Sequence, residues 1–264
     1  MQRVPKTNLI LGVIRLLRLK ARVEPGKIRK VRCHHEKSAR CQENDERFNM
    51  LTDRIRKRLL KYTRKAFRML PQMDKPRILD IGCGSGVSTL ELARLSHGEV
   101  IGIDIDQTAL DKFARNIEEA GLTARVQAIN CSMFDMDFAD ESFDIILSEG
   151  SIYATGFEKG LREWRRLLKP GGFIVVHDEQ GNVKEKLEQI HNCGYDLLGY
   201  FILSKETWWT EYFAPLEKLI KETGTRDTDD PTILAELQQA RWELDKFRKN
   251  PERNSSVCFV MKKH

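Results

Sequence analysis

Apolar residues in this chain recur in short runs, and the runs alternate with stretches of helical periodicity. An alternation of strands and helices is typical of a parallel sheet covered by helices on both faces. The predicted strands of this part are Ile78–Ile81, Val100–Ile105, Val126–Ile129, Phe143–Leu147 and Phe173–Val176, and the helices between them are Val87–Leu95, Thr108–Ala120 and Gly160–Leu168. We therefore expect an α/β fold whose ligand lies at the carboxyl ends of the strands.

The pattern continues on both sides of this core. An apolar stripe over Asn44 to Leu70 predicts an amphipathic helix that packs on the domain and ends at Pro71. Two more strands, Tyr195–Leu203 and Ser256–Met261, complete a doubly wound, Rossmann-like sheet of seven strands whose last strand is antiparallel. The predicted division is a basic arm (1–43), an amphipathic helix (44–76), a cofactor-binding α/β core (77–203), a helical insertion on the substrate side (204–250) and a final strand (251–264). A long helical insertion near the ligand edge is typical of a lid or a substrate pocket.

Three glycines follow the first strand at intervals of two residues: Gly82, Gly84 and Gly86. Glycines allow a tight turn from strand to helix and the close approach of a nucleotide-like ligand to the backbone. The dinucleotide pattern would need its third glycine at Val87, so the spacing argues against that class. Asp104 ends the second strand and can accept two hydrogen bonds from ribose hydroxyls; the alternative is that it caps the following helix.

Composition adds a marked asymmetry of charge. Residues 1–77 contain 23 Lys and Arg against 7 Asp and Glu, whereas the remainder contains 22 against 32. A basic segment of this kind indicates either a nucleic-acid or anionic-membrane partner or simply a solvated helical appendage. Six scattered cysteines are typical of free thiols in a reducing cytoplasm, which is the expected location. Leu9–Leu19 is too short and too charged to span a membrane, and it is expected to be an amphipathic helix that docks on the protein's own body, with a membrane-surface helix as the alternative.

One group of potential metal ligands lies in the basic arm. The group consists of Cys33, His34, His35 and Cys41, whose side chains would suit zinc. The sequence lacks both a C-x-x-C pair and a second half-site at the usual spacing. We therefore expect no structural metal.

The stretch from Asp80 to Gly86 resembles motif I of the class I S-adenosylmethionine-dependent methyltransferases. The resemblance covers roughly residues 77–178 and includes the acidic approach to the fourth strand and the Lys-Pro-Gly-Gly turn before the fifth. It implies that S-adenosylmethionine is the cofactor and S-adenosylhomocysteine the product. The cofactor-binding residues that it implies are Asp80, Gly82, Cys83, Gly84, Gly86, Asp104, Ile105, Ser132, Met133 and Glu149. Ser132 stands where the family usually has a carboxylate for the adenine amino group, which is a departure from its pattern.

Several side chains near the expected ligand edge could act on a methyl acceptor. Glu149 and Tyr153 follow the fourth strand and His177 ends the fifth, so these three are the candidate catalytic residues. Glu149 could also be an ordinary loop carboxylate, and a structural role for His177 is the more natural interpretation. Four aromatic residues at the start of the insertion, Trp208, Trp209, Tyr212 and Phe213, are the candidate substrate pocket, with burial in the core as the alternative.

The sequence thus predicts a methyltransferase that acts on a small-molecule acceptor, similar to the small-molecule and quinone-biosynthesis subgroup. The alternatives are an RNA or protein methyltransferase that uses the basic arm, and a non-catalytic binding module on the same fold. The Asn/Asp-Pro-Pro-aromatic motif of nucleic-acid amino methyltransferases is missing after the fourth strand, which counts against methylation of bases. Nucleic acid or an anionic membrane surface through residues 1–77, and a second copy of the chain, are left open as partners.

Overall fold

The computed structural model describes residues 52–224, 231–250 and 253–264. Its centre is one seven-stranded sheet in the order β3-β2-β1-β4-β5-β7-β6. The strands are β1 (Arg77–Ile81), β2 (Glu99–Asp104), β3 (Val126–Asn130), β4 (Phe143–Glu149), β5 (Leu168–Glu179), β6 (Tyr195–Leu203) and β7 (Ser256–Lys263). Strands β1 to β5 pair in parallel, whereas β7 pairs antiparallel with both β5 and β6. The predicted doubly wound sheet with an antiparallel last strand is confirmed.

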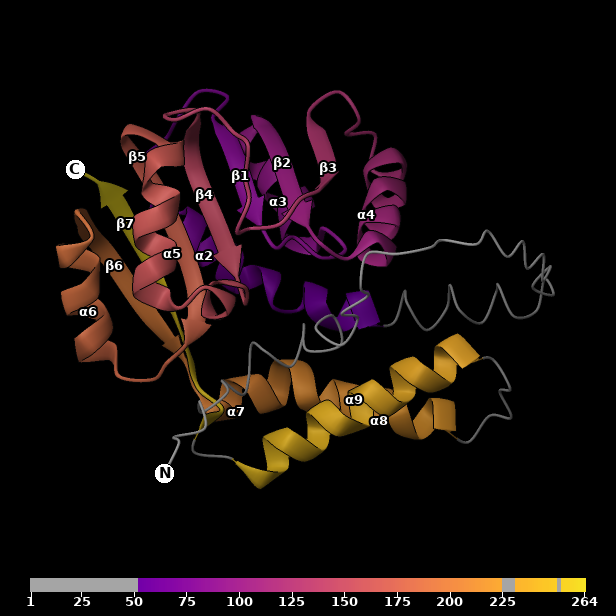
Figure 1. Cartoon of the computed structure of the whole chain (residues 1–264). Coiled ribbons are helices and arrows are strands. Elements are labelled where there is room, and N and C mark those ends of the chain that lie inside the picture. The colour runs from indigo at the N-terminus through magenta and orange to yellow at the C-terminus, as the bar shows by residue number, and fades with distance from the viewer. Residues whose placement is uncertain (1–51, 225–230, 251–252) are drawn as a thin grey trace, which may run out of the picture.

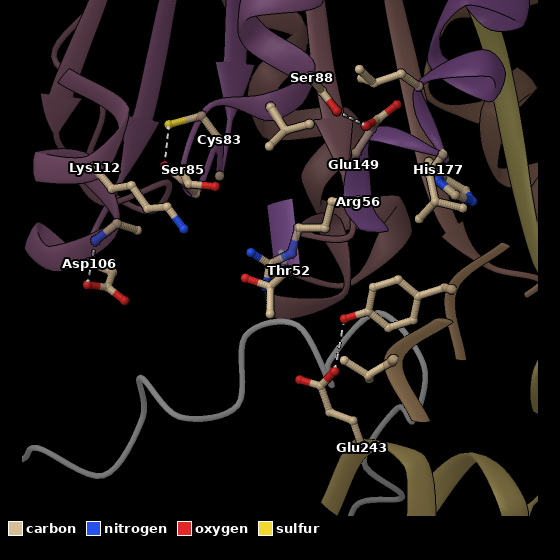
Figure 2. Close-up of a pocket in the computed structure, with 18 of the residues that line it drawn as sticks. Thr52, Arg56, Cys83, Ser85, Ser88, Asp106, Lys112, Glu149, His177 and Glu243 are labelled. Atoms are coloured by element: carbon tan, nitrogen blue, oxygen red, sulfur yellow. Dashed lines mark hydrogen bonds between the residues drawn. The ribbon is translucent and has the colours of Figure 1, made fainter. Parts of the chain in front are cut away.

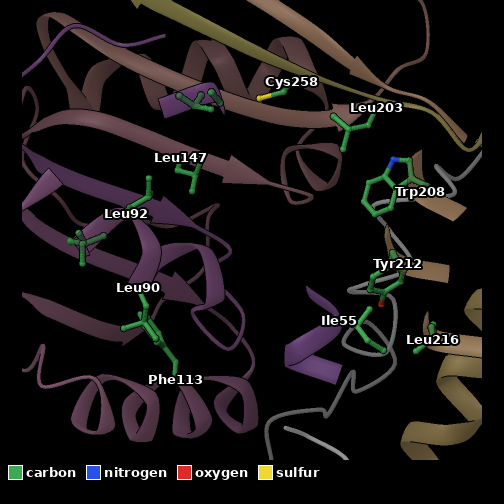
Figure 3. Packing of buried hydrophobic residues seen from close by; sticks show 14 of the residues in the cluster. Ile55, Leu90, Leu92, Phe113, Leu147, Leu203, Trp208, Tyr212, Leu216 and Cys258 are labelled. Atoms are coloured by element: carbon green, nitrogen blue, oxygen red, sulfur yellow. The ribbon is translucent and has the colours of Figure 1, made fainter. Parts of the chain in front are cut away.

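Helices cover both faces of this sheet (Figure 1). The helices are α2 (Leu60–Phe67), α3 (Val87–Ser96), α4 (Gln107–Glu119), α5 (Phe157–Trp164), α6 (Val183–Asn192), α7 (Lys205–Trp208), α8 (Ala214–Gly224) and α9 (Pro231–Lys249). One buried cluster joins the sheet to α2, α3, α4 and the insertion, through residues such as Leu90, Phe113 and Trp208 (Figure 3). A second cluster, which includes Leu161 and Ile190, packs α5 and α6 on the opposite face. The burial of these apolar side chains is the main force that holds the layers together.

The sheet has its reversal of strand order between β1 and β4, which are hydrogen-bonded neighbours. From this point the chain proceeds outward to β2 and β3 on one side and to β5 on the other. Connections leave the two central strands in opposite directions there, so a crevice opens at their carboxyl ends. The glycine turn follows β1 and Glu149 ends β4, so both lie at that crevice.

Three predicted elements differ from the structure. The helix expected over Gly160–Leu168 is α5, which ends at Trp164 and is followed by a 3-10 turn, Arg165–Leu167. The helix expected over Asn44 to Leu70 is interrupted within its described part, because residues 52–57 are helical, Arg58 and Leu59 form a turn, and α2 then begins. The Arg58 guanidinium donates from Nε to the carbonyl oxygen of Glu211 at 3.1 Å, so a contact with the insertion accompanies this break. The expected turn at 169–172 is part of β5, where the pairing with β4 has an irregularity between Phe143 and Ile145.

The insertion lies past the carboxyl ends of the parallel strands, where α8 and α9 run side by side (Figure 1). Between α7 and α8 the helix widens to a π-helical turn, Trp209–Phe213. The wider turn buries Tyr212 and Phe213 while Trp209 remains 36% exposed and stacks on Phe247. The insertion therefore covers the crevice, and two of its aromatic side chains, Trp208 and Tyr212, face the cavity there.

Candidate functional site

The glycine turn between β1 and α3 has the strained backbone that the sequence predicts. Gly82, Gly84 and Gly86 have φ angles of 82°, 56° and 78°, a left-handed region that side chains with a Cβ disfavour. A Cβ at Gly86 would lie 1.9 Å from the buried ring of Phe113, whereas a Cβ at Gly84 would have no atom within 4 Å. Glycine is therefore needed at position 86 because the turn packs against Phe113 there. At position 84 the absence of a side chain leaves space for a ligand beside the backbone.

Two buried carboxylates frame this turn. Asp80 accepts a hydrogen bond from the Thr89 hydroxyl at 2.6 Å. Asp104 accepts from the backbone N–H of Gly84 at 2.9 Å and from that of Asp106 at 3.1 Å. Asp106, rather than Asp104, is the residue whose side chain caps α4. Asp104 thus ties the end of β2 to the glycine turn.

A cavity of about 420 Å³ opens beside the turn. One end is formed by Asp80, Gly82, Gly84, Ser85 and Asp106, and the other by Trp208, Tyr212, Gln239 and Glu243 of the insertion. Residues 52–57 and α2 supply the wall between these ends, and Figure 2 shows Arg56 from that wall lying between the glycine turn and Glu243. The cavity is therefore bounded by the core, the helices before β1 and the insertion together.

Glu149 reaches the cavity from the end of β4. Its two carboxylate oxygens accept from the hydroxyls of Thr63 and Ser88, so α2 and α3 both hold it in place. Burial raises the pKa of this carboxyl, and the two hydroxyl donors offset part of that rise. Glu149 is thus a desolvated carboxylate whose hydrogen-bond donors are neutral.

His177 lies beside Glu149, as its register partner on the neighbouring strand β5, and stacks against the insertion. Its ring stacks on Trp208 with centroids 5.9 Å apart. Its Nε2 is 2.7 Å from the Ser256 hydroxyl, which also accepts from the Trp208 indole N–H at 2.9 Å. Burial, and then the charge of Lys186, lower the pKa of His177 to about 4. The imidazole is therefore neutral at physiological pH, and Ser256 joins it to the first helix of the insertion.

A polar network connects the insertion with the glycine turn. The Tyr212 hydroxyl donates to Glu243 at 3.1 Å, and Gln239 donates to the other oxygen of Glu243 at 3.1 Å. On the far side of Arg56, Asp53 accepts from the Ser85 hydroxyl at 3.3 Å. Burial raises the pKa of Glu243 to about 7. Helices distant in the sequence thus meet in one cluster of charged groups.

The other predicted site residues occupy varied positions. Ile105 is 49% exposed directly after β2. Ser132 lies in the loop after β3, where its hydroxyl accepts from the backbone N–H of Phe134 at 3.2 Å. Met133 and Tyr153 each pack against a core cluster, and Cys83 lines the cavity. Phe213 is buried in the core and contacts Phe247, with ring centroids 4.0 Å apart.

The sequence did not single out several residues that line the cavity. They are Arg56, Thr63, Ser88, Lys112, Gln239 and Glu243. Glu243 carried a detectable signal, because it adjoins the apolar stripe of α9 that includes Ala240, Leu244 and Phe247. For the others, the position depends on how distant helices pack.

Expectations for the beginning of the chain lie outside the described residues. These include the arm (1–43), its amphipathic stretch Leu9–Leu19 and the ligand group Cys33, His34, His35 and Cys41. In the described ranges, no helix has the length and apolarity to cross a bilayer. The same ranges contain no cluster of three or more potential metal ligands. Partners expected through residues 1–77, and a homodimer, stay predictions.

Comparisons with known proteins agree on one family. A family model described as a methyltransferase domain matches residues 73–245. The ubiquinone/menaquinone biosynthesis C-methyltransferase UbiE of Vibrio parahaemolyticus is 27% identical over 174 residues, which are 65% of this chain and 66% of that protein. The curated relatives are covered over 27% to 66% of their own length.

Solved structures show the same fold at low identity. An S-adenosylmethionine-dependent methyltransferase from Thiobacillus denitrificans, in complex with S-adenosylhomocysteine, has a TM-score of 0.56 and 18% identity over 78% of this chain and 91% of that one. The [4+2]-cyclase SpnF has a TM-score of 0.64 and 20% identity over 77% of this chain and 80% of its own. Because the family model matches well over half of its length, the chain belongs to the methyltransferase-domain family.

Proposed function

We propose that this protein transfers a methyl group from S-adenosylmethionine to a small-molecule acceptor. The observation that carries the proposal is the backbone at Gly84, which lines the cavity with open space beside it and whose N–H donates to the carboxylate of Asp104. A turn of this kind, with an acidic residue at the end of the neighbouring strand, suits a ligand that combines a ribose with a charged tail. Membership of the family supports the same activity.

The residues present fit this cofactor. Gly84 has room for a ligand against its backbone, and Asp80 and Asp106 place carboxylates at the same end of the cavity. Asp104 would hold the ribose, and Asp80 with the glycine turn would hold the amino-acid end. Ile105, Ser132 and Met133 would line the adenine side. When bound, the cofactor supplies a sulfonium methyl group that a nucleophile displaces in line.

The chain's own contribution is to bind, orient and exclude water. Trp208 and Tyr212 close the cavity opposite the glycine turn and position an acceptor there. Glu149, held by hydroxyls from two helices, is proposed to face the acceptor or the cofactor ammonium. His177 is neutral and tied to Ser256, which suits a wall of the cavity better than a proton carrier.

Titration calorimetry with S-adenosylhomocysteine tests the cofactor half. The wild-type protein is expected to bind it, and Asp104→Asn to bind at least about tenfold more weakly, because charge-assisted hydrogen bonds contribute about 1.5–3 kcal/mol. Asp111→Asn is the matched control, since this carboxylate is exposed on α4. Transfer of a labelled methyl group to the small-molecule fraction of a cell extract then tests the reaction. A folded wild-type protein that does not bind S-adenosylhomocysteine would overturn the proposal.

A further inference from the structure

The end of the cavity that the insertion forms contains a buried carboxylate, Glu243, whose hydrogen-bond donors in the described part of the chain are neutral. Glu243 is only 5% exposed, and it accepts from the Tyr212 hydroxyl and the Gln239 amide. A desolvated carboxylate is stabilised most by a positive charge close to it. Glu243 lines the cavity, so a ligand there can supply that charge.

The cations near Glu243 in the described part of the chain, Arg56 and Lys112, both contact Asp53. Arg56 Nη1 is 3.3 Å from Asp53 Oδ1, and Lys112 Nζ is 3.1 Å from Asp53 Oδ2. Arg56 does act on Glu243, but burial has the larger effect and the pKa of Glu243 stays raised at about 7. Lys112 is thus paired with Asp53, whereas Arg56 is shared among Asp53, Tyr212 and Glu243, and its charge offsets only part of the cost of burying Glu243.

Among the described residues that line the cavity, carboxylates outnumber cations. The lining carboxylates are Asp80, Asp106, Glu149, Glu236 and Glu243, and the lining cations are Arg56 and Lys112. His177 adds no charge, since its pKa is about 4. A bound S-adenosylmethionine, which has one net positive charge, would offset only part of this excess. The remaining field favours a second cation in the same cavity.

Two aromatic side chains share the cavity with Glu243, and one of them, Tyr212, donates a hydrogen bond to it. Trp208 and Tyr212 both line the cavity, with ring centroids 6.1 Å apart and planes nearly perpendicular. Aromatic faces attract cations, and the attraction grows when the site is shielded from water. Carboxylate and rings together form a site for an organic ammonium group.

We propose that the methyl acceptor is an amine, bound as its ammonium ion between the Glu243 carboxylate and the rings of Trp208 and Tyr212. The inference rests on the proposed function and names the substrate class of the same cavity. An ammonium nitrogen has no lone pair, so it must lose a proton before it can react. The Glu243 carboxylate accepts that proton: an N–H bond breaks, an O–H bond forms on Glu243, and the electron pair stays on nitrogen.

Three probes of one shape test the charge preference without any turnover. They are choline, its neutral isostere 3,3-dimethyl-1-butanol, and the anion 3,3-dimethylbutanoate, each titrated into the protein by calorimetry with S-adenosylhomocysteine present. Choline is expected to bind about tenfold more tightly than the neutral isostere, and the anion most weakly. Equal affinities, a preference for the anion, or no saturable binding of choline would overturn the proposal.

The pH dependence of choline binding tests the role of Glu243. Choline does not titrate, so its affinity should rise as the pH increases through about 7, where Glu243 becomes ionised. Among the groups around Glu243, Arg56 and Tyr212 have raised pKa values and do not change charge in this window, and Gln239 does not ionise. The remaining ionisable neighbours are Asp53, Lys112 and Glu236, of which Lys112 has a lowered pKa. A flat profile in the wild-type protein would contradict the assignment.

The Glu243→Gln variant should lose both the tenfold preference and the pH dependence. Asp245→Asn makes the same change on an exposed side chain of α9 and should keep both. If Glu243→Gln does not fold, the proposal is tested by the three probes and the pH profile measured on the wild-type protein. If the wild-type protein binds S-adenosylhomocysteine but shows no preference for choline, only the proposal of an amine acceptor is overturned. If it does not bind S-adenosylhomocysteine, the proposed function itself is overturned.

Discussion

One substitution at two positions of the glycine turn should separate packing from ligand binding. In Gly86→Ala the new methyl group would meet the Phe113 ring, whose Cδ2 lies 1.9 Å from the ideal Cβ position. Phe113 is fully buried and cannot move aside cheaply. In Gly84→Ala the methyl group would meet no atom within 4 Å and would project into the space proposed for the cofactor.

The magnitudes follow from two contributions. A left-handed residue with a Cβ costs about 1–2 kcal/mol, partly offset by about 0.4–1 kcal/mol because alanine restricts the unfolded chain. Overpacking in a dense core adds about 1–3 kcal/mol. We expect Gly86→Ala to lose about 2–4 kcal/mol, which lowers the melting temperature by roughly 4–16 °C. Gly84→Ala should lose only about 1 kcal/mol.

Gly121→Ala supplies the matched control for backbone strain. Gly121 has a φ of 65° and no atom within 4 Å of its ideal Cβ, and it follows α4 away from the cavity. Thermal unfolding of the three variants and calorimetry with S-adenosylhomocysteine form the assay. Gly84→Ala should match Gly121→Ala in stability and lose affinity, while Gly121→Ala keeps wild-type affinity. Equal stability of Gly84→Ala and Gly86→Ala, or unchanged affinity in Gly84→Ala, would refute the reasoning.

Two further predictions concern the walls of the cavity. Because the pKa of His177 is about 4 in the folded protein and 6.5 ordinarily, the folded state binds fewer protons between these values, and stability should fall by up to roughly 3 kcal/mol as the pH decreases across them. Urea unfolding at pH 4.5 and pH 7 should show a smaller difference for His177→Gln; an unchanged difference would assign the loss to other groups. Trp208→Ala should lose about 3–5 kcal/mol and Trp209→Ala about 1 kcal/mol, because Trp208 is 2% exposed and Trp209 is 36% exposed. Similar losses in both denaturation curves would mean that the two indoles are buried alike.

The glycine turn and the two carboxylates that frame it were predictable because they depend on local pattern. A buried strand, three glycines and an acidic residue at the end of the next strand lie close in sequence, and parallel strands bring their carboxyl ends together. The proposed acceptor half depends on Arg56 and Glu243, which meet only because distant helices pack around one cavity. The π-helical turn adds a phase shift, so helical spacing alone could not say that Trp209 faces outward while Tyr212 lines the cavity.

The register of the last two strands has a consequence for the architecture of the acceptor site. Leu203, at the end of β6, pairs with Ser256, at the start of β7, so the whole insertion leaves and re-enters the sheet at adjacent positions of one antiparallel pair. In topological terms β6 and β7 form a hairpin, and the insertion is its connection. A short turn could replace it without rethreading a strand, and a different insertion could be grafted there. The insertion residues proposed to bind the acceptor, Trp208, Tyr212 and Glu243, thus belong to a replaceable connection that is separate from the strands that carry the glycine turn.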